Sequence, residues 1–161
     1  FNTEVTIALI RGNPRDSVLK DVSVDSYRCL QELQKDKFKD LSASSHVNQP
    51  RFKLIIWKRL HKLRQELILK TLKEKKYFIP CYAGKLEAII YETGDVYPCE
   101  LLSMKIGSLR ECDYDFKRLW DSDNAKKVRD FISQSRCFCT HECNTRTSIL
   151  FNPKVMLKGK I

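Results

Sequence analysis

The sequence contains no apolar run long enough to cross a membrane. Its longest uncharged apolar runs are Val5–Ile10 and Leu54–Trp57, well short of the about 20 residues that a spanning helix needs. No charged segment followed by an apolar stretch and a small-residue cleavage site is present, so we expect no secretory signal. These absences predict a cytoplasmic location and no membrane partner.

Two common kinds of active site are also missing. Only five glycines are scattered along 161 residues, too few to build a glycine-rich nucleotide-binding loop. The sequence shows no Ser/His/Asp triad and no paired-carboxylate site of the kind that glycosidases use. We therefore assign no catalytic residue from the sequence.

Charge is present in abundance but is distributed unevenly. Lys and Arg number 30 against 20 Asp and Glu, a net charge of +10. Residues 1–80 carry 17 basic and 9 acidic side chains, whereas residues 81–161 carry 13 and 11. Ten of the basic side chains lie within residues 51–76. The chain is thus one basic segment joined to a nearly neutral half.

The basic segment predicts a long amphipathic helix over residues 51–78, ended by Pro80. Its apolar side chains recur at helical spacing. Such a helix could contact nucleic acid or an acidic partner. No aromatic stacking platform or base-reading motif accompanies the charge, so we favour a packed helix with a solvated basic face and expect no nucleic-acid partner. The apolar stripe consists of Phe52, Ile56, Leu60, Leu63 and Leu67.

The remaining patterns predict a mixed, α+β fold. Val5–Ile10 is typical of a buried strand, and Ser23 is a suitable N-cap for a helix reaching about Phe38. Residues 42–50 are polar and predict a linker. Residues 86–98 predict a β-hairpin, with Gly94 supplying the positive φ of its tight turn.

Two further elements are expected after the hairpin. Ile106–Leu109 predicts a short apolar turn or strand. Asp115–Ser133 is amphipathic and predicts a helix that is broken near Asp121 and Ser122.

Seven cysteines carry the chemistry of this sequence. An odd number fits poorly with a fully paired disulfide scaffold. Cys29 and Cys112 stand alone, and we expect them to be small, buried or partly exposed thiols. The other five fall into two groups in the second half of the chain.

The two cysteine groups predict a metal centre. Cys81 and Cys99 flank the hairpin, whose two ends lie close together. Cys137, Cys139 and Cys143 crowd three thiols into seven residues. Four thiolates suit tetrahedral zinc or an iron–sulfur cluster. The residues alone do not decide between zinc and an iron–sulfur cluster. They also leave open that these cysteines are reduced structural thiols or form disulfides instead of binding metal.

Several motifs follow one another in order through the second half of the chain. They are Cys81–Gly84 with Gly94–Cys99, Ile106–Glu111, Leu119–Ser122 with Arg129, Cys137–Cys143, and Phe151–Lys154. In this order and spacing they resemble the SPASM and Twitch domains, the C-terminal auxiliary-cluster modules of radical S-adenosylmethionine (SAM) enzymes. The likeness covers residues 81–154. The strand and loop near the start of the chain resemble, more loosely, the late part of a radical SAM barrel.

The resemblance implies one [4Fe–4S] cluster, as in the shorter Twitch form, because a full SPASM domain uses seven cysteine ligands. It implies Cys81 and Cys99 as the first ligand pair. For the second pair we favour Cys139 and Cys143, whose spacing leaves both thiolates room to turn inward, with Cys137 as the substitute. In family members such clusters carry electrons or help to position a peptide or small-molecule substrate.

One departure from the family limits what this chain does alone. The Cys-x3-Cys-x2-Cys motif that holds the SAM-cleaving cluster is absent from these residues. We therefore expect a radical SAM barrel as partner, upstream in the same chain or on another chain, and SAM only through that barrel. The expected organisation is a bridging, partly barrel-like region at 1–80, an auxiliary domain at 81–154 and a tail at 155–161.

Two alternatives remain open at this point. One is a zinc-stabilised module that binds nucleic acid or an acidic partner through residues 51–78. The other is a metal-free, catalytically silent remnant. His141 could serve as a ligand, but an outer-shell or surface histidine is favoured, and Glu142 is expected to be solvated.

Overall fold

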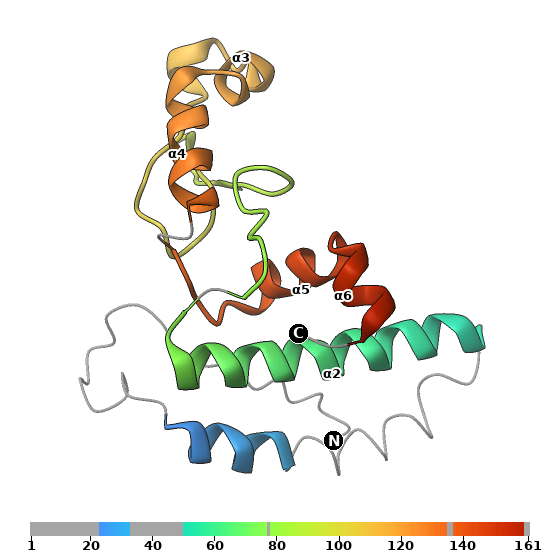
Figure 1. Ribbon diagram of the computed structural model, residues 1–161. Helices are drawn as coiled ribbons and strands as arrows, with labels where there is room; N and C mark the ends of the chain where they lie inside the picture. Colours follow the sequence, from blue (N-terminus) through green and yellow to red (C-terminus); the bar gives the residue numbers. More distant parts are fainter. Residues whose placement is uncertain (1–22, 33–49, 77, 135–136, 160–161) are drawn as a thin grey trace, which may run out of the picture.

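The computed structural model describes residues 23–32, 50–76, 78–134 and 137–159. The strand predicted at 5–10, residues 33–38 of the first predicted helix and most of the linker at 42–50 lie outside these ranges. Helices and one small antiparallel sheet make up the described part, which confirms the predicted α+β class. The long helix α2 (Arg51–Glu74) lies between the helical segment at 24–32 and the C-terminal helices, and the sheet with α3 (Phe116–Trp120) and α4 (Asp123–Ser133) stands away from it (Figure 1).

A helical segment at 24–32 begins where the sequence predicts. The hydroxyl of Ser23 accepts a hydrogen bond from the Ser26 amide at 3.0 Å, as an N-cap residue does. Tyr27 is buried against Ile68 of α2. The described part of this helix therefore packs on α2 rather than standing alone.

Helix α2 runs from Arg51 to Glu74. Lys75 then adopts the left-handed conformation, with φ of 48°, and its N–H donates to the Thr71 carbonyl at 2.9 Å. A left-handed residue with this hydrogen bond is a common way to end a helix. The predicted end at Phe78 is therefore wrong, because the backbone turns before Pro80 is reached.

Only part of the apolar stripe of α2 is covered. Leu63 and Leu67 are 1% and 4% exposed, whereas Phe52 is 60% exposed. Helix α5, residues Glu142–Leu150, packs against α2. The second half of α2 thus behaves as the packed helix that we favour from the sequence. Within the described ranges, no helix combines the length and apolar character required to span a membrane.

The sheet has three short antiparallel strands in the order β1-β2-β3. Ile89 faces Tyr97 across the first pair of strands, which confirms the predicted hairpin. Gly94 lies in the turn with φ of 87°, a conformation that side chains with a Cβ rarely adopt. The strands are β1 (Ile89–Ile90), β2 (Asp95–Tyr97) and β3 (Gly107–Ser108).

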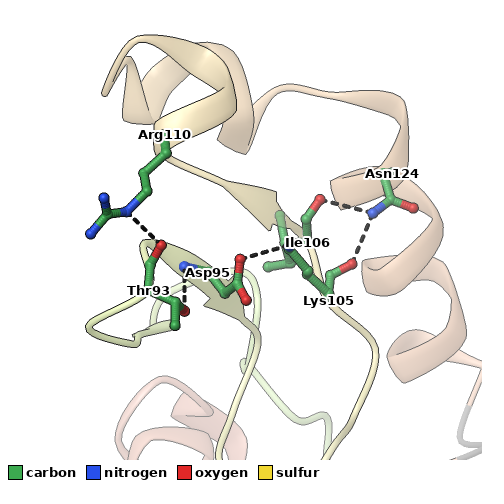
Figure 2. A network of polar contacts seen from close by, with 6 residues as sticks. All are labelled: Thr93, Asp95, Lys105, Ile106, Arg110 and Asn124. Atoms are coloured by element: carbon green, nitrogen blue, oxygen red, sulfur yellow. Dashed lines mark hydrogen bonds and ion pairs between the residues drawn. The ribbon is translucent and has the colours of Figure 1, made fainter.

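Side chains from beyond the sheet fix the hairpin in place (Figure 2). Arg110 donates from Nε to the Thr93 carbonyl in the turn at 2.8 Å. Asn124 donates from its amide to the carbonyls of Lys105 and Ile106, each at 2.8 Å. These bonds connect the hairpin turn to η2, and the backbone just before β3 to α4.

The helical stretch after the sheet is broken as predicted. Asp115 accepts from the Arg118 amide and caps the first piece, and Ser122 accepts from the Ala125 amide at 3.2 Å and caps the second. Each cap supplies an acceptor for an otherwise unpaired N–H. The two pieces are α3 (Phe116–Trp120) and α4 (Asp123–Ser133), and a 3-10 turn, η2 (Arg110–Cys112), precedes them.

The last helix extends into the residues that the sequence predicts as a tail. Helix α6 spans Pro153–Lys158. Asn152 caps it by accepting from the Val155 amide at 3.3 Å, and proline occupies the first helical position, where it fits well. Val155 is buried with Leu63 and Ile149, so this helix belongs to the packed structure.

Two main cores result. The hairpin core is built by the sheet with α3 and α4, and the helical core by α2 with α5 and α6. The hairpin core contains Ala83, Val96, Cys99, Ile106, Leu119, Ala125, Val128 and Ile132. The helical core contains Leu63, Leu67, Ile79, Ile149 and Val155.

Candidate metal centre

The first cysteine group is held by the base of the hairpin. Cys81 lies just before a tight turn in which the Gly84 amide donates to the Glu87 carbonyl at 2.8 Å. Cys99 follows β2 and is 6% exposed, and its Sγ accepts from the Leu102 amide at 3.4 Å. Cys81 packs at the edge of the hairpin core that contains Cys99. The hairpin thus brings both thiols to one end, as the sequence predicts.

The second group lies where the chain passes from α4 to α5. Cys137 and Cys139 occupy a segment without helix or strand, and each is half-buried. Cys143 lies on the first turn of α5 and is exposed. The three thiols therefore do not share one loop, because a helix begins at Glu142.

One pocket collects thiols from both groups. Its wall includes Cys81 and Cys99 from the hairpin and Cys137 and Cys139 from the later segment. Helix α2 and helix α5 complete the wall, while Cys143 does not line it. The structure therefore places four of the five predicted cysteines around a common space between the two cores.

The pocket is not arranged for a single ion as it stands. In the ranges described, no three or more His, Cys, Asp or Glu side chains are placed so that one metal ion could bind them.

Two thiols of the pocket, Cys81 and Cys137, lie in surroundings that favour their protonated form. Burial raises the pKa of Cys81 to about 11, and the neighbouring Cys139, Cys137 and Cys99 add to the effect. Burial likewise raises the pKa of Cys137 to about 11, with smaller contributions from Cys139 and Cys99. A metal centre is held by thiolates, so binding here must release protons. A dense set of thiols in an apolar pocket fits the donor chemistry of an iron–sulfur cluster.

Comparison with known proteins shows which family model the cysteine-bearing part of the chain matches. Residues 81–144 match the family model of SPASM, described as an iron–sulfur cluster-binding domain. This part of the chain is similar to a SPASM domain. The match begins at Cys81 and ends just after Cys143, so it includes both cysteine groups. Neither the curated proteins nor the solved structures yielded a match to this chain.

His141 lies inside the matched region, between Cys139 and Cys143, and is buried, 7% exposed. Its Nε2 is 2.9 Å from Oε2 of Glu100, so the ring N–H donates to that carboxylate. Its Nδ1 is buried and has no hydrogen-bond partner in the described part of the chain. The expectation of an outer-shell or surface histidine is thus refined, because the ring is clearly not on the surface.

Glu142 is also less solvated than the sequence predicts. Its side chain is 22% exposed, and Oε2 is 3.7 Å from Nη1 of Arg64 on α2. The expectation of a solvated carboxylate is wrong because α5 turns this side chain toward the basic helix. Its place at the first turn of α5 also suits the positive end of the helix dipole.

Sequence analysis does not identify Glu100 and Arg64 as part of this region. Both act over long sequence separations, on His141 and Glu142 respectively, and no local pattern marks such a pair. The adjacency of Glu100 to Cys99 is the one signal available. The lone cysteines lie elsewhere: Cys29 is exposed and Cys112 is half-buried beside the hairpin core.

Proposed function

We propose that the SPASM-like domain of this chain holds one [4Fe–4S] cluster in the pocket between its two cores. The observation that carries the proposal is that four cysteines from two distant segments line one space, within a domain whose family binds iron–sulfur clusters. When bound, such a cluster supplies a one-electron redox couple. The protein supplies thiolate ligands and an apolar wall that limits contact with water.

Three ligands are common to every assignment that we consider. They are Cys81, Cys99 and Cys139. For the fourth, the shared pocket supports Cys137, while the wider spacing in the sequence supports Cys143. Since Cys143 is exposed on α5, we propose Cys137 as the fourth ligand, with Cys143 as the alternative.

The proposed role is that of an auxiliary cluster coupled to a radical SAM barrel. The cluster would pass electrons, or its domain would position a peptide or small-molecule substrate. The barrel, in the same chain or on another, would bind SAM and carry out the radical chemistry. The resemblance over residues 81–154 supports this context, and the proposed compartment is the reducing cytoplasm, where free thiols persist.

Anaerobic reconstitution with iron and sulfide tests the proposal directly. We expect a brown protein with about four irons and four sulfides per chain. A colourless protein that holds one tight zinc would contradict it and would turn attention to the zinc-stabilised alternative.

Variants then identify the ligands. Cys99→Ala should abolish cluster binding, whereas Cys112→Ala, outside the pocket, should leave the iron content unchanged. Comparison of Cys137→Ala with Cys143→Ala decides the fourth ligand, since only the true ligand should be needed for full iron content. Retention of the full cluster by Cys99→Ala would mean that the ligand set is wrong.

A further inference from the structure

One hydrogen bond joins the two cysteine groups of the SPASM-like domain. Glu100 directly follows Cys99, and His141 lies two residues from Cys139 and two from Cys143. Nε2 of His141 and Oε2 of Glu100 are 2.9 Å apart. The bond therefore connects backbone segments that each carry a cysteine of the candidate centre.

Burial makes this bond important to His141. The ring is 7% exposed and its Nδ1 has no hydrogen-bond partner among the described residues. Without Glu100, the ring would lose the hydrogen bond described for its Nε2 as well. A buried polar group without a partner carries a full desolvation penalty, so the ring would be driven out toward water, and the segment with Cys139 would move with it.

The neighbouring ion pair between Glu142 and Arg64 joins a different part of the structure. Glu142 pairs with Arg64 of α2, so it attaches the start of α5 to the helical core. Glu100, by contrast, belongs to the loop that leaves the hairpin core at Cys99. The bond between Glu100 and His141 reaches from the second cysteine group to the loop that follows Cys99.

We propose that Glu100 and His141 are positioning residues, which hold the second cysteine group against Cys99 so that the thiolates converge on one cluster. This inference rests on the proposed function. In this role His141 positions the second cysteine group and does not itself bind the metal.

Cluster retention in the full chain tests the proposal. Glu100→Ala should speed loss of the cluster to an iron chelator by about tenfold, the scale seen when outer-shell partners of metal ligands are removed. Glu100→Gln keeps an oxygen that accepts from Nε2 and should restore retention. Glu92→Ala is the matched control, because this glutamate is exposed on the same hairpin and its carboxylate has no hydrogen bond or ion pair in the described part.

Spectroscopy separates positioning from ligation and from a general loss of structure. Glu100→Ala should shift the midpoint potential and the EPR spectrum of the reduced cluster, while Glu92→Ala leaves both unchanged. Equal retention in Glu100→Ala and wild type would overturn the proposal. A nitrogen coupling to the cluster that disappears in His141→Gln would also overturn it, because the ring would then be a ligand.

The apoprotein gives a test that does not depend on any cluster. Alkylation of Cys137 and Cys139 should be several-fold faster in Glu100→Ala than in wild type, Glu100→Gln or Glu92→Ala. Unchanged alkylation would refute the positioning role even if the wild type binds a cluster. Failure of the wild type to take up iron, with faster alkylation in Glu100→Ala, would instead refute the proposed function alone.

Discussion

The hairpin core and the helical core are built in different ways. The hairpin core gathers side chains from one continuous stretch, Ala83 to Ile132. The helical core joins Leu63 and Leu67, which precede the hairpin core in the sequence, to Ile149 and Val155, which follow it. The cysteine pocket touches both, because Cys99 and Leu67 each line it. A site placed between a local core and a long-range core depends on the integrity of both.

The largest effect should come from a cavity in one core at a time. Leu119→Ala in the hairpin core and Leu63→Ala in the helical core each remove a side chain that is at most 2% exposed. Each should lower the free energy of unfolding by about 3 kcal/mol. Denaturant titration measures the loss, and hydrogen exchange locates it.

The comparison between the cores predicts opposite exchange patterns. Leu119→Ala should accelerate exchange mainly in β2 and α4, and Leu63→Ala mainly in α5 and α6. Identical exchange patterns in the two variants would show that the cores unfold as one unit.

A smaller effect should follow from Gly94→Ala in the hairpin turn. This residue has φ of 87°, and an added Cβ would lie 3.0 Å from Cγ of Arg110. The strained backbone and the close contact should together cost about 2 kcal/mol. Thermal unfolding measures the loss, with Glu92→Ala, at an exposed position of the same turn, as control. A stability equal to wild type would mean that the turn relaxes without strain.

A hydrogen bond from Thr147 on α5 to Glu87, near the hairpin, connects the two cores, and Thr147→Val should weaken this connection. Thr147 on α5 donates from Oγ1 to Oε2 of Glu87 at 2.8 Å, and Oε1 of Glu87 is buried without a partner in the described part. Valine keeps the shape of threonine but removes the donor, so we expect a loss of about 1.5 kcal/mol. Chemical denaturation checks this value. A double variant with Glu87→Gln whose losses simply add would exclude direct coupling.

The smallest effect should be a pH dependence confined to the helical side. Burial, together with the nearby Arg64 charge, lowers the pKa of His61 from 6.5 to about 4. The unfolded chain therefore binds more protons than the folded chain between these pH values, and stability should decrease as pH falls from 6.5 toward 4. Allowing for the partial exposure of the ring, we expect about 1 kcal/mol. In His61→Gln, urea denaturation at several pH values should show a flatter profile, and an unchanged slope would assign the effect to other groups.

Elements fixed by local chemistry could be predicted from the sequence. Ser23 and Ser122 cap helices through their own hydroxyls, and Gly94 occupies a position of the hairpin turn that needs a positive φ. The two cysteine groups were predicted for the same reason, since their spacing is local.

Elements fixed by distant contacts could not be predicted. Helix α5 has no amphipathic pattern, because polar side chains such as Asn144 and Ser148 are buried on its inner face. The end of α2 depends on a lysine in a left-handed conformation, which no sequence rule favours at Lys75. The bond between Glu100 and His141 likewise exists only once both cores are in place.

The construction of the helical core also bears on how quickly the site can form. Loop-closure entropy must be overcome before α2 and α5 meet, whereas the hairpin layer needs only short loops. Cys81 and Cys99 therefore become neighbours through fast local events, and Cys139 joins them through a slower, long-range one. Because a bound cluster would bridge both groups, it would act as a covalent staple across this long-range contact, and its removal should raise the unfolding rate more than it lowers the folding rate.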